Sequence, residues 1–223
     1  MSLIRAIYIF IPLIALLAGV YSFKFLNREF RIIVFYVATG FGIEVTNWLL
    51  VKAGIRNNMP GLHFYIMFEF LIWSVFYIHF LDGYIKKIYL LTGTVLFEVF
   101  CVVNMIFLQK LTEYPITRSV ENLLLILLAV LFFGKVMTEA EIERLAYSPL
   151  IWINTVVLFY FAGNFFYNVV FIQILAKNVH MLRTLNIYIF AIFNTIYYFG
   201  IMVGFLLHRI NLPHGSDLTI SKT

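Results

Sequence analysis

Long apolar segments separated by short polar connections run along the whole chain. Each segment is near the roughly 20 residues that an α-helix needs to cross the hydrocarbon of a bilayer. None alternates apolar and polar residues as a barrel strand does, and backbone groups in lipid must be hydrogen-bonded within the spanning structure. The pattern therefore predicts seven membrane-spanning helices, at about 3–23, 31–52, 62–81, 87–108, 117–137, 149–175 and 182–208.

The connections between these segments contain the residues that end helices and attract water. They include NRE at 27–29, RNNMPG at 56–61, LDGYIKK at 81–87 and EYP at 113–115. No composition change or internal repeat marks a second domain. We therefore expect one all-α domain over residues 1–223, a polytopic seven-transmembrane-helix bundle.

Composition and charge support the same class. The chain is 63% hydrophobic and 12% charged, whereas a soluble domain is nearer half apolar and about a quarter charged. The net charge of +5 is spread over several connections, as membrane-flanking Lys and Arg are, so no nucleic-acid partner is expected. Slightly more Lys and Arg flank the C-terminal side, and this bias predicts the N-terminus outside and the C-terminus inside.

Carboxylates and amides occur inside the apolar segments, where an ionised side chain costs at least about 2–3 kcal/mol. In FYIMFEFLIW (64–73), Glu69 has nine apolar or aromatic neighbours. Followed along alternating helix directions, these polar residues fall between the middle of the membrane and the N-terminal face. They predict either a polar, aromatic-walled cavity open to that face or interhelical hydrogen bonding without a ligand. The candidate ligand-binding residues are Glu44, Asn47, His63, Tyr65, Glu69, Glu98, Asn104, Asn122, Asn164, Asn168 and Asn194.

Glu121 is expected nearer the membrane surface, where Arg118, one turn earlier, can pair with it. The histidines lack metal-ligand spacing, the single Cys101 cannot form an intramolecular disulfide, and the segment 182–208 has no lysine for retinal. No nucleophile or phosphate-binding motif is present. We therefore expect no metal and no cofactor, and we assign no catalytic residue.

The stretch NNMPGLHFYIMFEFLIWSVFY (57–77) resembles N-N-x-x-x-x-H-x-Y-x-x-x-E-F-L, a pattern of small seven-span bacterial membrane proteins frequent in Bacteroidota. WINTVVLFYFAGNFFYN (152–168) and ENLLLILLAVLFFGK (121–135) have a similar character. The resemblance implies a seven-helix fold and a bacterial inner (cytoplasmic) membrane, but no activity. By this resemblance, the characteristic positions of that family correspond to His63, Tyr65, Glu69, Asn164 and Asn194.

Three functions remain open at this point. The first is a receptor or sensor that binds a small or lipidic ligand in the cavity and signals through a protein partner. That partner would contact the C-terminal side and the acidic stretch at 137–147. The second is a membrane-embedded enzyme acting on a lipid or isoprenoid, with Glu69 and Glu98 as acid and base and His63 assisting. The third is a transporter that uses the glutamates as a proton relay. We favour the first, with the lipid bilayer as its surroundings.

Overall fold

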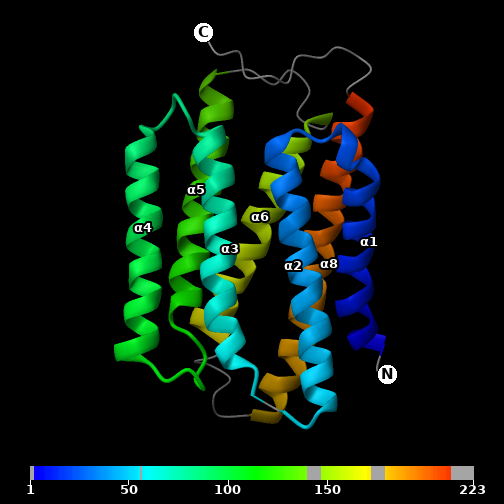
Figure 1. Ribbon diagram of the computed structural model, residues 1–223, viewed down its shortest axis with the longest axis vertical. Helices are drawn as coiled ribbons and strands as arrows, with labels where there is room; N and C mark the ends of the chain where they lie inside the picture. The colour runs from blue at the N-terminus through cyan, green and yellow to red at the C-terminus, as the bar shows by residue number, and fades with distance from the viewer. Residues whose placement is uncertain (1–2, 56, 140–146, 172–178, 212–223) are drawn as a thin grey trace.

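The computed structural model describes residues 3–55, 57–139, 147–171 and 179–211 (Figure 1). These residues form seven long helices arranged in one bundle, and no strand occurs among them. The helices are α1 (Leu3–Ser22), α2 (Arg28–Lys52), α3 (Met59–Phe80), α4 (Lys87–Val103), α5 (Thr117–Glu139), α6 (Pro149–Phe166) and α8 (Val179–Asn211). A 3₁₀ turn (Phe23–Phe25) follows α1, and π-helical turns extend α4 (Asn104–Leu108) and α6 (Tyr167–Phe171).

Six of these helices are long and apolar enough to cross a membrane. The remaining one, at the N-terminus, contributes a shorter apolar helix, Ile9–Phe25. The chain is therefore an all-α integral membrane protein with six candidate spans among the described residues, and the sequence predicted seven. The first helix itself, α1, runs from Leu3 to Ser22, close to the predicted 3–23.

Local signals explain where the helices begin. The Asn27 side chain accepts a hydrogen bond from the Phe30 amide at 3.1 Å, so α2 begins at Arg28, one turn earlier than predicted. The Ser148 side chain likewise accepts a hydrogen bond from the Ile151 amide at the start of α6, and Pro149 occupies the first helical position. Gly83, between α3 and α4, has a φ of 84°, a conformation that few other residues adopt easily.

The helices form a closed ring in chain order. Each packs against the next, and α8 closes the ring by packing against both α6 and α1. α3 also contacts α5 directly, which leaves α4 outside this contact, at the edge of the bundle opposite α1 (Figure 1). As a result α3 provides the centre of the core, with Trp73, Phe76 and Tyr77 fully buried.

Neighbouring helices run in opposite directions, so the bundle has two ends. We call the end where α1, α3, α5 and α8 begin the N-terminal face, and the other end the C-terminal face (Figure 1). The N-terminal face also receives the ends of α2, α4 and α6.

α6 and α8 approach each other closely because α8 has two glycines one turn apart. A Cβ at Gly200 would lie 2.1 Å from a methyl carbon of Val156, and one at Gly204 would lie 2.7 Å from Ile153. Small residues at this spacing let membrane helices pack backbone to side chain. This contact sets how α6 and α8 present their polar residues to the bundle interior.

Two cations that the sequence places at the membrane surface are buried. Lys135 donates to the backbone carbonyls of Phe80 at 3.1 Å and Asp82 at 2.8 Å, so it binds the end of α3. Arg118 is buried near the start of α5. Arg118 no longer counts among the positive charges that flank the N-terminal side, and Lys135 no longer counts among those that flank the C-terminal side. The difference between the two sides is unchanged, so the predicted orientation stays the same. Most of the acidic stretch after α5, residues 140–146, lies outside the described residues.

Candidate functional site

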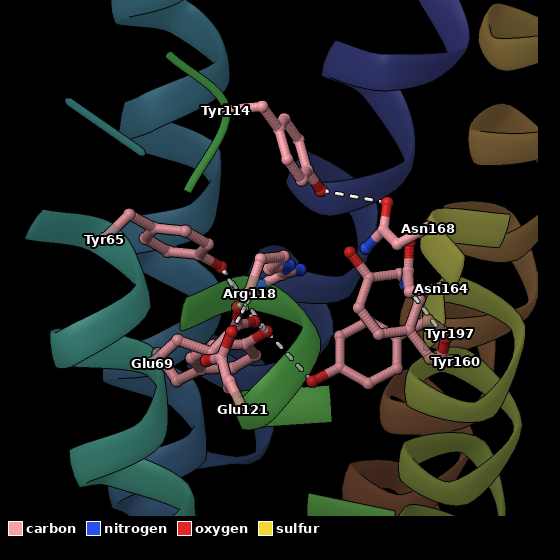
Figure 2. A network of polar contacts seen from close by, with 10 residues as sticks. Tyr65, Glu69, Tyr114, Arg118, Glu121, Tyr160, Asn164, Asn168 and Tyr197 are labelled. Atoms are coloured by element: carbon pink, nitrogen blue, oxygen red, sulfur yellow. Dashed lines mark hydrogen bonds and ion pairs between the residues drawn. The ribbon is translucent and has the colours of Figure 1, made fainter. Parts of the chain in front are cut away.

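The centre of the polar site is Glu69, which lies midway along α3 and is fully buried. Its Oε1 accepts hydrogen bonds from the hydroxyls of Tyr36 at 2.5 Å and Tyr65 at 3.1 Å. Its Oε2 accepts from Arg118 (Figure 2). Both carboxylate oxygens are therefore occupied, by side chains from three helices.

Arg118 is the second residue of α5 and is 5% exposed. Its Nη1 donates to Glu69 and also to Glu121 Oε2 at 2.7 Å. Glu121 follows by three residues, so both side chains lie on one face of α5. A guanidinium has five N–H donors, and among the described residues only Nη1 has hydrogen-bond partners. One nitrogen of the guanidinium thus contacts both carboxyl groups, and its other N–H groups have no hydrogen-bond partner among the described residues.

Aromatic side chains from α2, α3, α6 and α8 surround this group. The Tyr197 hydroxyl lies 2.9 Å from that of Tyr36, and the two form a hydrogen bond. The Tyr197 ring stacks on Tyr160, with ring centroids 4.3 Å apart, and Tyr36 packs edge-on against Trp73 at 5.4 Å. These rings limit the access of water to the ion pairs, which strengthens the electrostatic interactions within the site.

Several polar atoms beside Arg118 are buried without a partner. Asn122 is one turn after Arg118 and on the same face of α5, and it is fully buried. Asn164 Nδ2 donates to the Tyr160 carbonyl at 2.9 Å, but its oxygen accepts nothing. The unpartnered atoms on these two helices are Glu121 Oε1, Asn122 Oδ1 and Nδ2, Asn164 Oδ1 and Asn168 Nδ2.

The connection between α4 and α5 covers the site on the side of the N-terminal face. The Tyr114 hydroxyl donates to Asn168 Oδ1 at 3.1 Å, across the top of the group as drawn in Figure 2. His63 Nε2 donates to the Glu113 carbonyl at 3.2 Å. The same connection leads directly into Arg118, so its position and that of the guanidinium are linked.

The structure places four of the predicted site residues at this group, Tyr65, Glu69, Asn164 and Asn168. A fifth, Asn122, follows Arg118 by one turn on the same face of α5. Glu44 is half-buried, has no hydrogen bond among the described residues, and lies within electrostatic reach of Tyr160 and Tyr198. Glu98 of α4 is also half-buried, and its Oε1 has no partner in the described part of the chain.

The other predicted residues have different surroundings. Asn47 accepts a hydrogen bond from Asn58 at 3.2 Å at the N-terminal face. Asn104 donates to Gln109 at 3.2 Å and so steadies the α4–α5 connection, as His63 does. Asn194 is half-buried and makes no hydrogen bond to the described residues.

Sequence reasoning missed most of the partners of Glu69. Arg118 was interpreted as a surface-flanking charge, and Glu121 was expected near the membrane surface, although their predicted pairing is present. Their spacing of three residues at the start of an apolar segment was the available signal. The tyrosines Tyr36 and Tyr160 carried no such signal, because the chain has 14 Tyr and 25 Phe in similar apolar settings.

A separate apolar groove of about 680 Å³ lies between α6 and α8. Phe159, Ala162 and Ile192 are among the residues that line it. On α6 these positions point away from Tyr160 and Asn164, which face the polar group. The groove is therefore distinct from the polar site.

The described residues contain no cluster of three or more His, Cys, Asp or Glu side chains that could hold a metal ion. Both oxygens of Glu69 already accept hydrogen bonds within the protein. The free acceptors and donors around Arg118 can instead form hydrogen bonds to a small guest molecule. The chain matches no protein-family model, no curated protein and no solved structure, so this geometry is the basis for any functional assignment.

Proposed function

We propose that this protein is a receptor-like membrane protein that binds a small ligand between its helices, next to Arg118. The observation that carries the proposal is the set of buried, unpartnered polar atoms on Glu121, Asn122, Asn164 and Asn168. Each buried donor or acceptor left unsatisfied costs about 1–3 kcal/mol. A ligand that supplies the missing hydrogen bonds would recover that free energy on binding.

The alternative is that these amides only hold helices together. Asn154, in the half of the bundle nearer the C-terminal face, shows how a structural amide looks here. It accepts from the Tyr77 hydroxyl at 2.7 Å and donates to the Ala129 carbonyl at 3.0 Å. Asn122 is equally buried and makes neither kind of bond. This contrast favours a binding role for Asn122.

Binding at this position would couple several helices. The polar site joins α2, α3, α5, α6 and α8, so a ligand there favours the helix arrangement that best completes its contacts. We propose that a protein partner on the C-terminal side senses this arrangement. An acid–base role for Glu69 receives less support, because both of its oxygens already accept hydrogen bonds.

Native mass spectrometry of the purified protein tests the proposal, with Asn122→Leu as the central variant. Wild-type protein should carry an additional bound mass, and Asn122→Leu should lose it. Compared with ligand-free wild-type protein, the variant should also be more stable to thermal unfolding, by about 1–3 kcal/mol, because it removes unsatisfied buried groups.

Asn154→Leu is the matched control, since it makes the same change at a buried site outside the polar group. It should keep the bound mass and lose stability, because two hydrogen bonds disappear. A wild-type protein without bound mass, together with an unstabilised Asn122→Leu, would show that the amides act only in helix packing.

A further inference from the structure

The polar site holds more carboxyl groups than cationic side chains. Glu69 and Glu121 share the single guanidinium of Arg118. The only other Lys or Arg that the described residues bury is Lys135, which binds carbonyls near the C-terminal face. Glu98 lies within electrostatic reach of Glu121 and adds no positive charge. Carboxyl groups in excess of cationic side chains at membrane depth can bind a cation as their counter-charge, where a proton otherwise fills that role.

The unpartnered atoms point the same way. Three of the five are oxygens, Glu121 Oε1, Asn122 Oδ1 and Asn164 Oδ1, and the other two are the amide nitrogens of Asn122 and Asn168. All three side chains are fully buried, and Figure 2 shows Glu121 and Asn164 on two sides of Arg118. A group with several N–H donors would satisfy such acceptors, whereas an anion would meet two carboxylates for each guanidinium.

The walls suit an organic cation rather than a bare metal ion. Tyr36, Tyr160 and Tyr197 lie around the carboxyl groups, and the apolar parts of such rings can contact an alkyl chain. Arg118 itself lies 5.9 Å from the centre of the Phe161 ring. The described chain also lacks a cluster of three or more ionisable metal ligands here.

Resting on the proposed function above, we infer that the ligand is a small organic cation with N–H groups, such as an alkylammonium. Its N–H groups donate to Glu121 and the two asparagine oxygens, and its alkyl part lies against the tyrosines. No covalent step is involved.

A charge series on one carbon chain tests this inference. Wild-type protein in lipid nanodiscs is titrated with butylammonium chloride, 1-butanol and sodium butyrate at pH 7 and constant ionic strength. Trp73 lies against Tyr36, so tryptophan fluorescence can report occupancy. Butylammonium should bind about tenfold more tightly than 1-butanol, and butyrate should not bind saturably.

Glu121→Gln should remove this preference, because it removes the excess carboxylate while keeping a side-chain oxygen for Arg118. Glu29→Gln is the control: Glu29 pairs with His79 at 3.3 Å near the C-terminal face, outside the site. The control should keep the wild-type preference for butylammonium.

Three results would overturn the inference. They are a preference for 1-butanol or butyrate, an equal response to sodium or calcium chloride, and a Glu121→Gln protein that binds like Glu29→Gln. In each case a bound mass that still depends on Asn122 would leave the proposed function standing. Absence of saturable binding by any probe would also overturn the inference, and with an apo wild-type mass the proposed function would fail as well.

Discussion

At the residue scale, the two glutamates Glu69 and Glu98 differ in what they contact. Glu69 accepts hydrogen bonds from two tyrosines and one arginine, whereas Glu98 Oε1 is buried without a partner among the described residues. Hydrogen bonds to a charged group contribute about 1.5–3 kcal/mol each, roughly twice a neutral one. The two positions should therefore respond differently to the same substitution.

We predict that Glu69→Gln lowers the free energy of unfolding by about 2–4 kcal/mol, because it weakens the pairing that Arg118 needs when buried. Glu121 still contacts Arg118 in this variant, so the fold should persist. Glu98→Gln should be neutral or slightly stabilising. Thermal unfolding in detergent measures both, and equal losses at the two positions would contradict this assignment of Glu69.

At the element scale, the α6–α8 contact depends on the absence of side chains at two positions of α8. The Cβ of any residue at Gly200 would overlap Val156. Gly93 on α4 offers the opposite case, since nothing lies within 4 Å of a Cβ placed there. Both glycines lie inside helices, so the two differ mainly in packing.

We predict that Gly200→Ala lowers stability by about 1–3 kcal/mol through overpacking. Gly93→Ala should raise stability by about 0.5–1 kcal/mol, because alanine restricts the unfolded chain and favours the helix. Thermal unfolding of the two variants side by side provides the measurement. A stable Gly200→Ala protein would indicate that α6 and α8 can separate at little cost.

At the scale of the whole molecule, the helix order determines which connections share a face. The α4–α5 connection with Glu113 lies at the N-terminal face, and the α3–α4 connection with Lys86 lies at the C-terminal face (Figure 1). Both side chains are exposed, and the only native thiol, Cys101, is buried. The molecule therefore offers a clean labelling test of its topology.

We predict that Glu113→Cys and Lys86→Cys react with a membrane-impermeant maleimide from opposite sides. The charge bias predicts that Glu113→Cys is labelled on intact cells and Lys86→Cys only after the membrane is opened. Wild-type protein controls for Cys101. Labelling of both variants from one side would contradict the helix order, and the reverse pattern would invert the predicted orientation.

Sequence alone determined the class of protein and most helix positions. Apolar segments near the length of a bilayer, broken by residues such as Asn27 and Gly83, specify helices through local chemistry. It also indicated Glu69, Asn122 and Asn164, because a polar group in an apolar segment is visible in one dimension. α2 begins at Arg28, three residues before its predicted start, and this difference shows the limit of reading boundaries from composition.

Only the tertiary structure decided how these residues meet. Arg118 stands 49 positions after Glu69, and Tyr197 stands 161 positions after Tyr36. Such pairs depend on the ring order of the helices and on the rotation of each helix about its axis. Those rotations are set by side-chain packing between helices, as at Gly200 and Val156, and packing between distant segments leaves no periodic signal in the sequence.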